Sequence, residues 1–243
     1  MDPSVHREEH AVEASHWWFV GRRRLFGRIL RDLGVPRDAK ILDAGSSTGT
    51  NLRMLRDLGY THAVGLDKSP DAARFCHEKG LGPVLVGDLR ELPFASDRLD
   101  VVLATDIVEH VEDDMRAAQE IARVLEPGGS ALLTVPAFPA LWGRQDDVSH
   151  HRRRYRRGEL ERVVERAGLR IVERFYFNWI LLPPIWAARQ VMRIARSRVD
   201  SENQVNMPLL NAALLRLFTL DVRLARRVKP PAGVSLLLLC RKG

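Results

Sequence analysis

The sequence predicts an α/β fold in which a doubly wound, mostly parallel, seven-stranded sheet carries a helical cap inserted near the C-terminus. Short apolar runs alternate with amphipathic segments that end at glycine through residues 38–136, which is typical of parallel strands joined by helices. Two later apolar runs enclose about 50 residues, which is too long for a simple connection and indicates a helical insertion.

The strands and helices can be placed in order along the chain. We expect strands at 40–44, 62–67, 83–88, 99–105, 130–136, 170–179 and 233–243. We expect helices at 50–59, 69–80, 113–129 and 157–169. The second helix carries clear end signals, because Ser69 and Pro70 open it and Gly80 closes it.

The charge is distributed unevenly. Residues 1–149 carry 18 Lys/Arg and 24 Asp/Glu, a net charge of −6, whereas residues 150–243 carry 20 and 7, a net charge of +13. This asymmetry indicates an anionic partner for the C-terminal part: nucleic acid, a membrane surface or a phosphorylated substrate. A solvated basic surface is the alternative without a partner.

Cysteine usage and hydrophobicity favour a cytoplasmic protein. Cys76 and Cys240 lie far apart, which excludes a disulfide framework or a zinc site built from cysteines and suits a reducing compartment. The first residues, MDPSVHREEH, contain no apolar signal region, and no run reaches the roughly 18 apolar residues of a membrane-spanning helix.

The stretch ILDAGSSTGTNL predicts a ligand-binding loop between the first strand and the first helix. Gly45 and Gly49 permit tight turns and close approach of a ligand, and Asp67 ends the next strand 22 residues after Gly45, where a carboxylate can hold ribose hydroxyls. The sequence does not match the dinucleotide-binding motif G-x-G-x-x-G, because Ser47 and Thr50 stand where the motif requires its second and third glycines. This mismatch disfavours a nicotinamide-dependent oxidoreductase. The sequence does not match a P-loop motif either, because no lysine follows Gly49.

Four segments in register resemble the successive motifs of class I S-adenosylmethionine-dependent methyltransferases. They are LDAGSSTGTNL, GLDKSP, GDLRELPFASDRLDVVLATDIVEHVEDD and LEPGGSALLTVP, within residues 38–136. The resemblance implies a Rossmann-like methyltransferase fold and S-adenosylmethionine as the cofactor. The residues that it assigns to the cofactor are Asp43, Gly45, Ser47, Gly49, Asp67, Asp88, Leu89, Ala104 and Asp106.

Within that set, the resemblance implies that Asp43 and the loop 45–49 hold the methionine end. It further implies that Asp67 takes the ribose, that Asp88 meets the adenine amino group, and that 104–106 close the pocket near the sulfonium. Capping of the following helix and turn is the structural alternative for Asp67 and Asp88. Ser47 replaces the family's usual middle glycine, and we expect a slightly shifted loop to tolerate it.

The N-terminal segment, residues 1–37, is predicted to lie over the cofactor as a lid. Trp17 and Trp18 would shield the sulfonium, to which aromatic faces are attracted, and Arg22 or Arg23 would reach the cofactor's carboxylate. The alternative is an amphipathic helix whose aromatic side chains pack on the sheet while its arginines face solvent.

The stretch DDVSHHRRRYRR follows the fifth strand at the edge where a methyl acceptor should enter. A histidine oriented by a carboxylate can serve as a general base, so the catalytic candidates are Asp147, His150, His151 and Tyr155. His110 is a further candidate for the base, although we expect it first to have a packing role. The candidates for acceptor binding are Trp17, Trp18, Trp142, Arg152 and Arg154. A salt-bridge network that holds the loop is the structural alternative, while a metal site and nucleic-acid binding are disfavoured.

We therefore expect a cofactor-binding domain at 38–178 and 230–243, and a helical cap at 179–229 that faces the acceptor or a membrane. The predicted function is S-adenosylmethionine-dependent methylation of a small molecule, with a prenyl, lipid-linked or sugar-phosphate acceptor favoured by the apolar and basic composition of 179–229. The alternative is a protein of the same fold without catalysis, either a cofactor-binding protein or a partner subunit. Peripheral membrane contact and a homodimer are the partners that 179–229 suggests.

Overall fold

The computed structural model describes residues 10, 12–194 and 207–243. Its helices are α2 (Trp17–Asp32), α3 (Thr50–Asp57), α4 (Pro70–Glu78), α5 (Asp114–Val124), α6 (Arg144–Val148), α7 (Arg157–Arg166), α8 (Leu182–Ile194) and α9 (Pro208–Val228), with 3₁₀ turns η1 (Val108–His110) and η2 (Pro139–Leu141). Its strands are β1 (Lys40–Ala44), β2 (His62–Asp67), β3 (Val84–Val86), β4 (Leu99–Thr105), β5 (Leu125–Pro136), β6 (Leu169–Phe177) and β7 (Ser235–Lys242). Residues 1–9 and 11 of the predicted lid and 195–206 of the predicted insertion lie outside the described residues.

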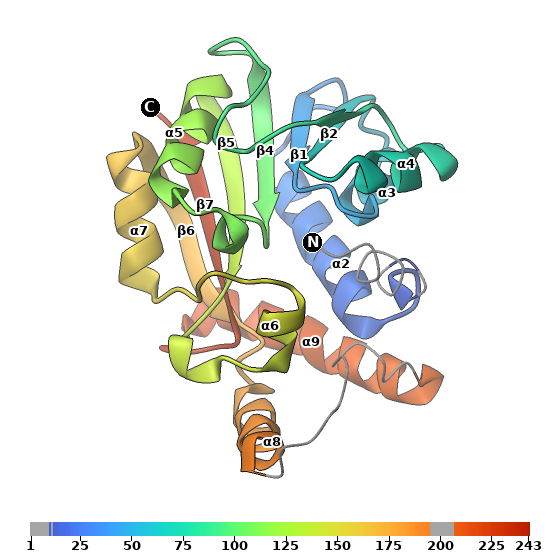
Figure 1. Cartoon of the computed structure of the whole chain (residues 1–243), viewed down its shortest axis with the longest axis vertical. Coiled ribbons are helices and arrows are strands. Elements are labelled where there is room, and N and C mark those ends of the chain that lie inside the picture. The colour runs from blue at the N-terminus through green and yellow to red at the C-terminus, as the bar shows by residue number, and fades with distance from the viewer. Residues whose placement is uncertain (1–9, 11, 195–206) are drawn as a thin grey trace.

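The seven strands form one sheet in the order β3-β2-β1-β4-β5-β7-β6 (Figure 1). Only β7 runs against its neighbours, and it pairs antiparallel with both β5 and β6. The predicted doubly wound, mostly parallel fold is therefore confirmed. The strand order reverses between β1 and β4, so a crevice at the carboxyl ends of these strands is the place where such sheets bind ligands.

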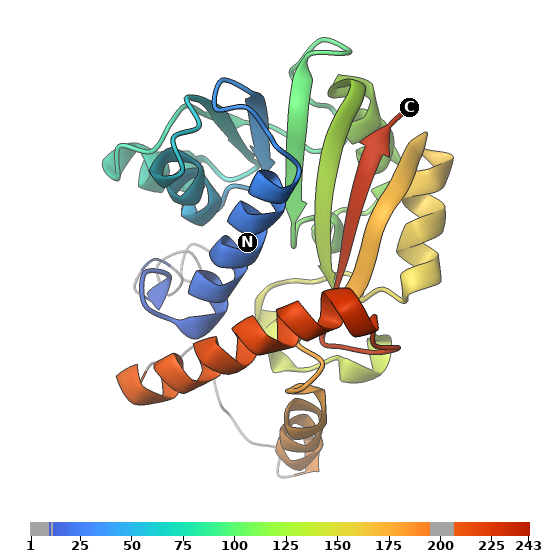
Figure 2. The same cartoon turned by 180° about the vertical axis from the view of Figure 1, so that it is seen from behind.

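Side-chain alternation divides the core into two layers. Leu42, Val102 and Leu238 face α5 and α7, whereas Ile41 and Leu103 face the opposite layer, which is formed by α2, α3 and α9. Strand residues alternate between faces, so each strand supplies both layers. Figure 1 shows α5 and α7 in front of the sheet, and Figure 2 shows α2 and α9 crossing the back.

One strand begins earlier than expected. The segment Pro127-Gly128-Gly129, which we expected to close the preceding helix, lies within β5. Leu125 pairs with Leu99, while the next pair along the two strands joins Ser130 to Val101, so the intervening residues bulge out of the ladder. The start of β5 is therefore decided by its pairing with β4, which lies at least 20 residues earlier in the chain, and not by the turn residues Pro127-Gly128-Gly129.

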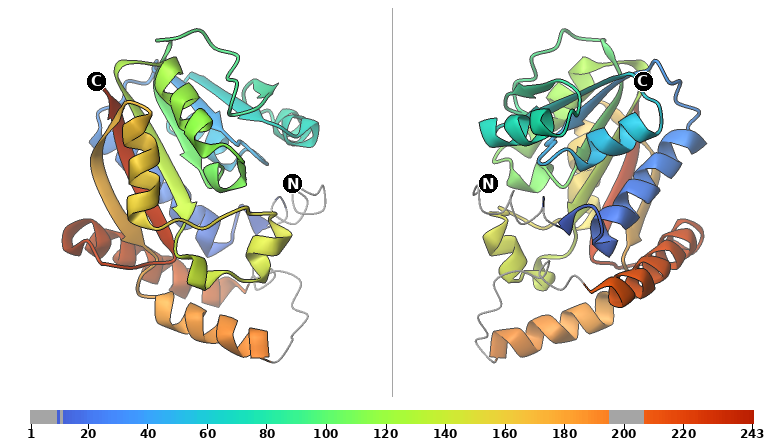
Figure 3. Two further views of the ribbon diagram at one scale, coloured as in Figure 1. Left: turned by 60° about the vertical axis from the view of Figure 1, so that its left-hand side comes forward. Right: turned by 90° about the vertical axis from the view of Figure 1, so that its right-hand side faces the viewer.

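The segment 179–229 contributes to the main core as well as to the carboxyl edge of the sheet. Phe218 and Val222 of α9 are buried against the sheet. Asp221 accepts backbone hydrogen bonds from Asn178 at 2.6 Å and Ile180 at 2.8 Å, which ties α9 to the end of β6. Figure 3 shows α6, α8 and α9 gathered near this edge.

Candidate active site

The loop between β1 and α3 depends on its two glycines. Gly45 and Gly49 have φ values of +79° and +85°, in the left-handed region that favours glycine. A Cβ on Gly45 would lie 2.8 Å from Ile107, and one on Gly49 would lie 2.6 Å from Leu81. Ser47 also lies in the left-handed region, with a φ of +44°. The loop therefore keeps the backbone conformation that usually favours glycine, and the serine adopts it.

Asp67 and Asp88 lie at the carboxyl ends of neighbouring strands, and both line the cleft. Asp67 accepts backbone hydrogen bonds from Ser47 and Ser69, each at 2.9 Å. It therefore stabilises both the cofactor loop and the start of α4. Arg90 donates to both oxygens of Asp88 at 3.0 and 2.8 Å. These hydrogen bonds hold the pKa of Asp88 well below its usual range, so it presents a charged carboxylate.

Asp43 is fully buried beneath the loop. Its Oδ1 accepts a hydrogen bond from Asn51 at 2.9 Å, whereas its Oδ2 has no hydrogen-bond partner within the described chain. Burial raises the pKa of Asp43 to about 7. Asp43 does not itself line the cleft, but a buried carboxyl oxygen without a partner favours the approach of a donor or a cation.

Arg22 reaches the same end of the cleft from α2. Its Nη2 lies 2.8 Å from Oδ2 of Asp106, and its guanidinium lies over the rings of Trp18 and Phe26 at 5.4 and 5.3 Å. Its Nε is buried without a hydrogen-bond partner among the described residues. One unpartnered donor on Arg22 and one unpartnered acceptor on Asp43 fit the carboxylate and the ammonium at the methionine end of S-adenosylmethionine.

The two apolar cofactor candidates differ in their position. Leu89 is buried beside Asp88 and lines the cleft. Ala104 is fully buried in the core layer that faces α5 and α7, and it does not line the cleft.

The aromatic residues of the N-terminal segment both line the cleft and pack against the core. Trp17 and Trp18 appear among the lining residues. Trp18 also stacks on Phe177 with ring centroids 6.1 Å apart, and Trp17 lies 6.0 Å from Phe218. The two alternatives for these tryptophans are therefore compatible in one structure.

Sequence reasoning missed Glu13, which joins the N-terminal segment to the cofactor loop. This side chain is buried, lies 2.8 Å from Nη2 of Arg53 and 2.7 Å from Nζ of Lys79, and accepts a hydrogen bond from Thr48. A lone glutamate in an acidic stretch carries no signal of burial, so only its packing reveals the role.

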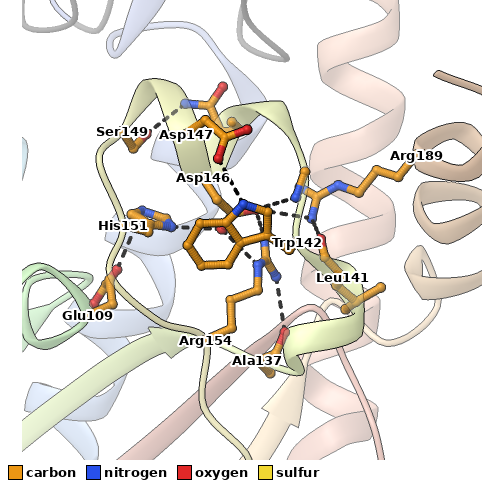
Figure 4. A network of polar contacts seen from close by, with 12 residues as sticks. Glu109, Ala137, Leu141, Trp142, Asp146, Asp147, Ser149, His151, Arg154 and Arg189 are labelled. Atoms are coloured by element: carbon orange, nitrogen blue, oxygen red, sulfur yellow. Dashed lines mark hydrogen bonds and ion pairs between the residues drawn. The ribbon is translucent and has the colours of Figure 1, made fainter. Parts of the chain in front are cut away.

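The loop after β5 is organised by a buried carboxylate, Asp146 (Figure 4). Arg154 donates to both of its oxygens at 2.7 and 3.0 Å, the backbone of Gly143 donates at 2.8 Å, and Nδ1 of His151 lies 2.8 Å from Oδ1. Arg189 of α8 lies 3.8 Å from Oδ2. Burial alone would raise the pKa of Asp146, but hydrogen bonds from His151 and Arg154 outweigh it and lower the pKa to about 2.

This network corrects two predictions for the loop. Asp147, the carboxylate that we expected to orient a histidine, is exposed and accepts a hydrogen bond from Nε1 of Trp142 at 2.8 Å. Trp142 is occupied by that contact and does not appear among the residues that line the cleft. Asp146 takes the orienting position because its side chain, one residue earlier on α6, faces Arg154 and the core.

The prediction of a catalytic Tyr155 is also wrong. Its hydroxyl donates to Oδ2 of Asp114 at 2.8 Å, and its ring is buried in the core layer of α5 and α7. Burial raises the pKa of Tyr155 far above its ordinary value. Arg154 and Tyr155 are neighbours in an extended segment, so they point to opposite sides, and only Arg154 faces the cleft.

The remaining polar candidates converge on the acceptor end of the cleft, which is lined by His110, His150, His151 and Arg152. The rings of His110 and His151 meet edge to face at 4.8 Å, and burial lowers the pKa of His110 to about 4. Glu109, which sequence reasoning overlooked, lies beside them with its carboxylate fully buried, and burial raises its pKa well above the usual range. The signal available in the sequence was its place between Val108 and His110.

Both groups of residues share one cleft of about 960 Å³ at the carboxyl edge of the sheet. The cofactor end is lined by Arg22, Gly45, Ser47, Asp67 and Asp88, and the acceptor end by the three histidines with Arg152 and Arg154. Asp106 lies between them, where its carboxylate also accepts a hydrogen bond from Thr134 at 3.0 Å. The fold and the site together are those of a class I S-adenosylmethionine-dependent methyltransferase domain.

Comparisons with known proteins agree. Residues 42–133 match the family model described as "Methyltransferase domain". Over 138 residues the chain is 30% identical to 2-methyl-6-phytyl-1,4-hydroquinone methyltransferase of Arabidopsis thaliana, covering 55% of this chain and 40% of that protein. It is 29% identical over 161 residues to a probable S-adenosylmethionine-dependent methyltransferase of Mycolicibacterium smegmatis, covering 64% and 60%.

The fold is shared with solved structures at lower identity. The methyltransferase in complex with the Trm112 activator of Haloferax volcanii superposes with a TM-score of 0.65 at 21% identity, covering 98% of this chain and 94% of that one. This likeness shows the shared fold. The match of residues 42–133 to the methyltransferase family model, together with the named relatives, shows a methyltransferase domain of the class I S-adenosylmethionine-dependent enzymes, and S-adenosylmethionine is its cofactor. It spans less than two thirds of the length of either curated relative.

Proposed function

We propose that the protein transfers the methyl group of S-adenosylmethionine to a small-molecule acceptor that carries a prenyl, lipid-linked or sugar-phosphate group. The observation that carries the proposal is the cleft of about 960 Å³, in which cofactor and acceptor residues face one space. This volume is at the upper end of the range for small-molecule sites, so it leaves room for an acceptor beside the cofactor.

The cofactor supplies a methyl group that is already activated on its sulfonium, so the chain's main tasks are alignment and exclusion of water. Trp17 and Trp18 cover the cleft from the N-terminal side. The acceptor's nucleophile would be activated at the group formed by Glu109, His110 and His151, with Asp146 replacing the predicted Asp147 as the residue that orients His151.

The lining of the acceptor end favours an anionic head group with an apolar chain. Arg152 and Arg189 line it with guanidinium groups suited to phosphate or other oxygen-rich groups, while Trp17 and Ile185 supply apolar surface. The Arabidopsis relative is named for a phytyl hydroquinone, which also combines a polar ring with an apolar chain. This parallel supports a prenylated acceptor for the present chain.

We further propose a cytoplasmic protein that meets the membrane surface through 179–229. Apolar side chains are exposed on α8 and α9, namely Trp186, Val191, Leu209, Leu220 and Val228, and α9 also exposes arginines. No helix among the described residues is both long and apolar enough to cross a bilayer. The described surface therefore favours contact at the interface.

Liposome binding tests this contact. We expect the protein to co-sediment with anionic vesicles at low salt, and Leu209→Asp combined with Trp186→Ala to reduce the bound fraction. Leu85→Asp, at an apolar side chain exposed on β3 away from α8 and α9, is the matched control and should not change it. A shift to a dimer without vesicle binding would instead assign these helices to a homodimer contact.

Cofactor binding and turnover test the proposed function together. A ligand at about 100 times its dissociation constant stabilises the native state by roughly 2.7 kcal/mol. We expect S-adenosylmethionine and S-adenosylhomocysteine, but not NAD, to raise the melting temperature, and we expect Asp67→Ala to remove the effect. Asp57→Ala, at an exposed aspartate of α3, is the control that should keep it.

Labelled methyl transfer to prenyl and sugar phosphates then separates the enzyme from its alternative. Stabilisation by both sulfur cofactors without transfer to any acceptor of these classes would favour a cofactor-binding protein without catalysis. Absence of stabilisation by either cofactor would contradict the proposed function itself.

A further inference from the structure

We propose that Glu109, His110 and His151 bind a divalent first-row transition-metal ion at the acceptor end of the cleft, with open positions for an oxygen of the acceptor. The inference rests on the proposed function and specifies the chemistry at its site. One ligand atom from each residue lies within 4.8 Å of the others, and all three residues line the cleft. Two imidazoles and one carboxylate with open positions are typical of catalytic zinc and non-haem iron(II) sites.

Glu109 provides evidence that is independent of the cluster's composition. Its side chain is 0% exposed, and neither carboxylate oxygen has a hydrogen-bond partner among the described residues. A buried carboxyl in this state is costly unless a proton, a cation or a metal compensates for the lost hydration. The unpartnered oxygens of Glu109 are therefore suited to bind a cation.

The gap between Glu109 and His151 suits an ion. Nε2 of His151 lies 3.9 Å from Oε1 of Glu109, which is too far for a hydrogen bond. Metal bonds of about 2.1 Å to each atom span such a gap. The ligand atoms of the three residues lie up to 4.8 Å apart, and ligand atoms around a tetrahedral ion lie roughly 3.4 Å apart, so the three side chains must draw closer when the ion binds.

His151 is oriented by a carboxylate, as metal-binding histidines usually are. Its Nδ1 lies 2.8 Å from Oδ1 of Asp146 (Figure 4), so the carboxylate sets the ring orientation and leaves Nε2 for a ligand. Arg154 and Gly143 hold Asp146 in turn. The N–H of Arg152 donates to the carbonyl of Glu109 at 3.0 Å, which ties the two ligand-bearing segments together.

The donor set also indicates the kind of metal. Imidazole nitrogens favour zinc, iron, cobalt and nickel, whereas magnesium and calcium prefer oxygen ligands throughout. Such an ion lowers the pKa of a bound hydroxyl group, so an acceptor with a hydroxyl or phenol oxygen suits the site. The expectation of no metal site considered only Asp147 and the adjacent histidines, and Glu109 did not belong to that set.

Titration of the chelator-treated full chain with Co²⁺, followed by visible absorption, tests the proposal. We expect one Co²⁺ per chain with absorption bands typical of four or five ligands, and competition by Zn²⁺ but not by Mg²⁺. Glu109→Gln and His151→Gln should each weaken binding by more than the roughly 10- to 100-fold that loss of an outer partner costs. His77→Gln, at an exposed histidine on α4, is the matched control and should bind normally.

Stabilisation by S-adenosylhomocysteine, measured on every variant, shows which proteins are folded and separates this inference from the proposed function. No Co²⁺ binding by a chain that the cofactor product stabilises would overturn the metal site and leave the methyltransferase intact. Binding that both variants retain would assign the ion to other histidines and also overturn it. Co²⁺ binding without any cofactor stabilisation would support the metal site while contradicting the proposed function.

Discussion

Replacing Asp146 by alanine is expected to lower the free energy of unfolding by about 3–5 kcal/mol and to abolish methyl transfer. The substitution would leave the buried guanidinium of Arg154 without its carboxylate partner, and breaking a buried ion pair from one side is strongly destabilising. It would also release His151 from the contact that aims its ring into the cleft. Urea unfolding measures the first effect, and transfer of labelled methyl measures the second.

Asp147→Ala is the matched control for this prediction. Asp147 is exposed, and its contact with Trp142 is one hydrogen bond, so we expect a loss below about 1 kcal/mol and little change in turnover. Equal effects of the two alanine substitutions would contradict the assignment of Asp146 as the organising residue. A silent Asp146→Ala variant would contradict the whole network.

Asp43→Asn is expected to stabilise the protein above neutral pH and to abolish cofactor binding. Burial raises the pKa of Asp43 from 3.8 to about 7, so the folded chain holds this proton more tightly than the unfolded chain. Stability therefore falls as pH rises from about 4 to about 7. The cost is complete above pH 7 and amounts to at most about 4 kcal/mol, since one pKa unit corresponds to about 1.4 kcal/mol.

Asparagine carries no charge at any pH, so the variant should be more stable than the unmodified chain at pH 8, with the difference shrinking toward pH 4. Urea unfolding at the two pH values checks this. Stabilisation by S-adenosylhomocysteine should disappear in Asp43→Asn and persist in Asp57→Asn, which changes an exposed aspartate of α3. A stability difference that is the same at both pH values would show that Asp43 is not the ionising group.

The cofactor half of the site could be predicted from the sequence because its signals are local. Gly45 and Gly49 mark backbone positions with positive φ, and Asp67 ends the next strand. In a parallel sheet the carboxyl ends of neighbouring strands meet at one edge, so residues at those ends come together wherever the strands are recognised. Ser47 has a φ of +44°, so a serine here adopts a backbone conformation that usually favours glycine.

For the acceptor half of the site, the sequence predicted the segment that forms it but not which side chains of that segment face the cleft. Asp146 and Asp147 are adjacent on α6, and successive residues of a helix point roughly 100° apart. Which of them meets Arg154 depends on how this short helix packs. In the extended segment that follows, Arg154 and Tyr155 point to opposite sides, and only the bridge between Ala137 and Tyr155 decides which side faces the core.

The sequence by itself determined the alternation of strands and helices, the cofactor loop and the family, because apolar periodicity and glycine conformations are properties of neighbouring residues. The tertiary structure alone decided that Asp146 orients His151, that Tyr155 belongs to the core, and that Glu109 lies buried beside two histidines. These pairings join side chains from separate loops, and the burial of a carboxylate depends on what packs around it. No local pattern encodes that packing, so the chemistry of the acceptor end emerges only when the chain has folded.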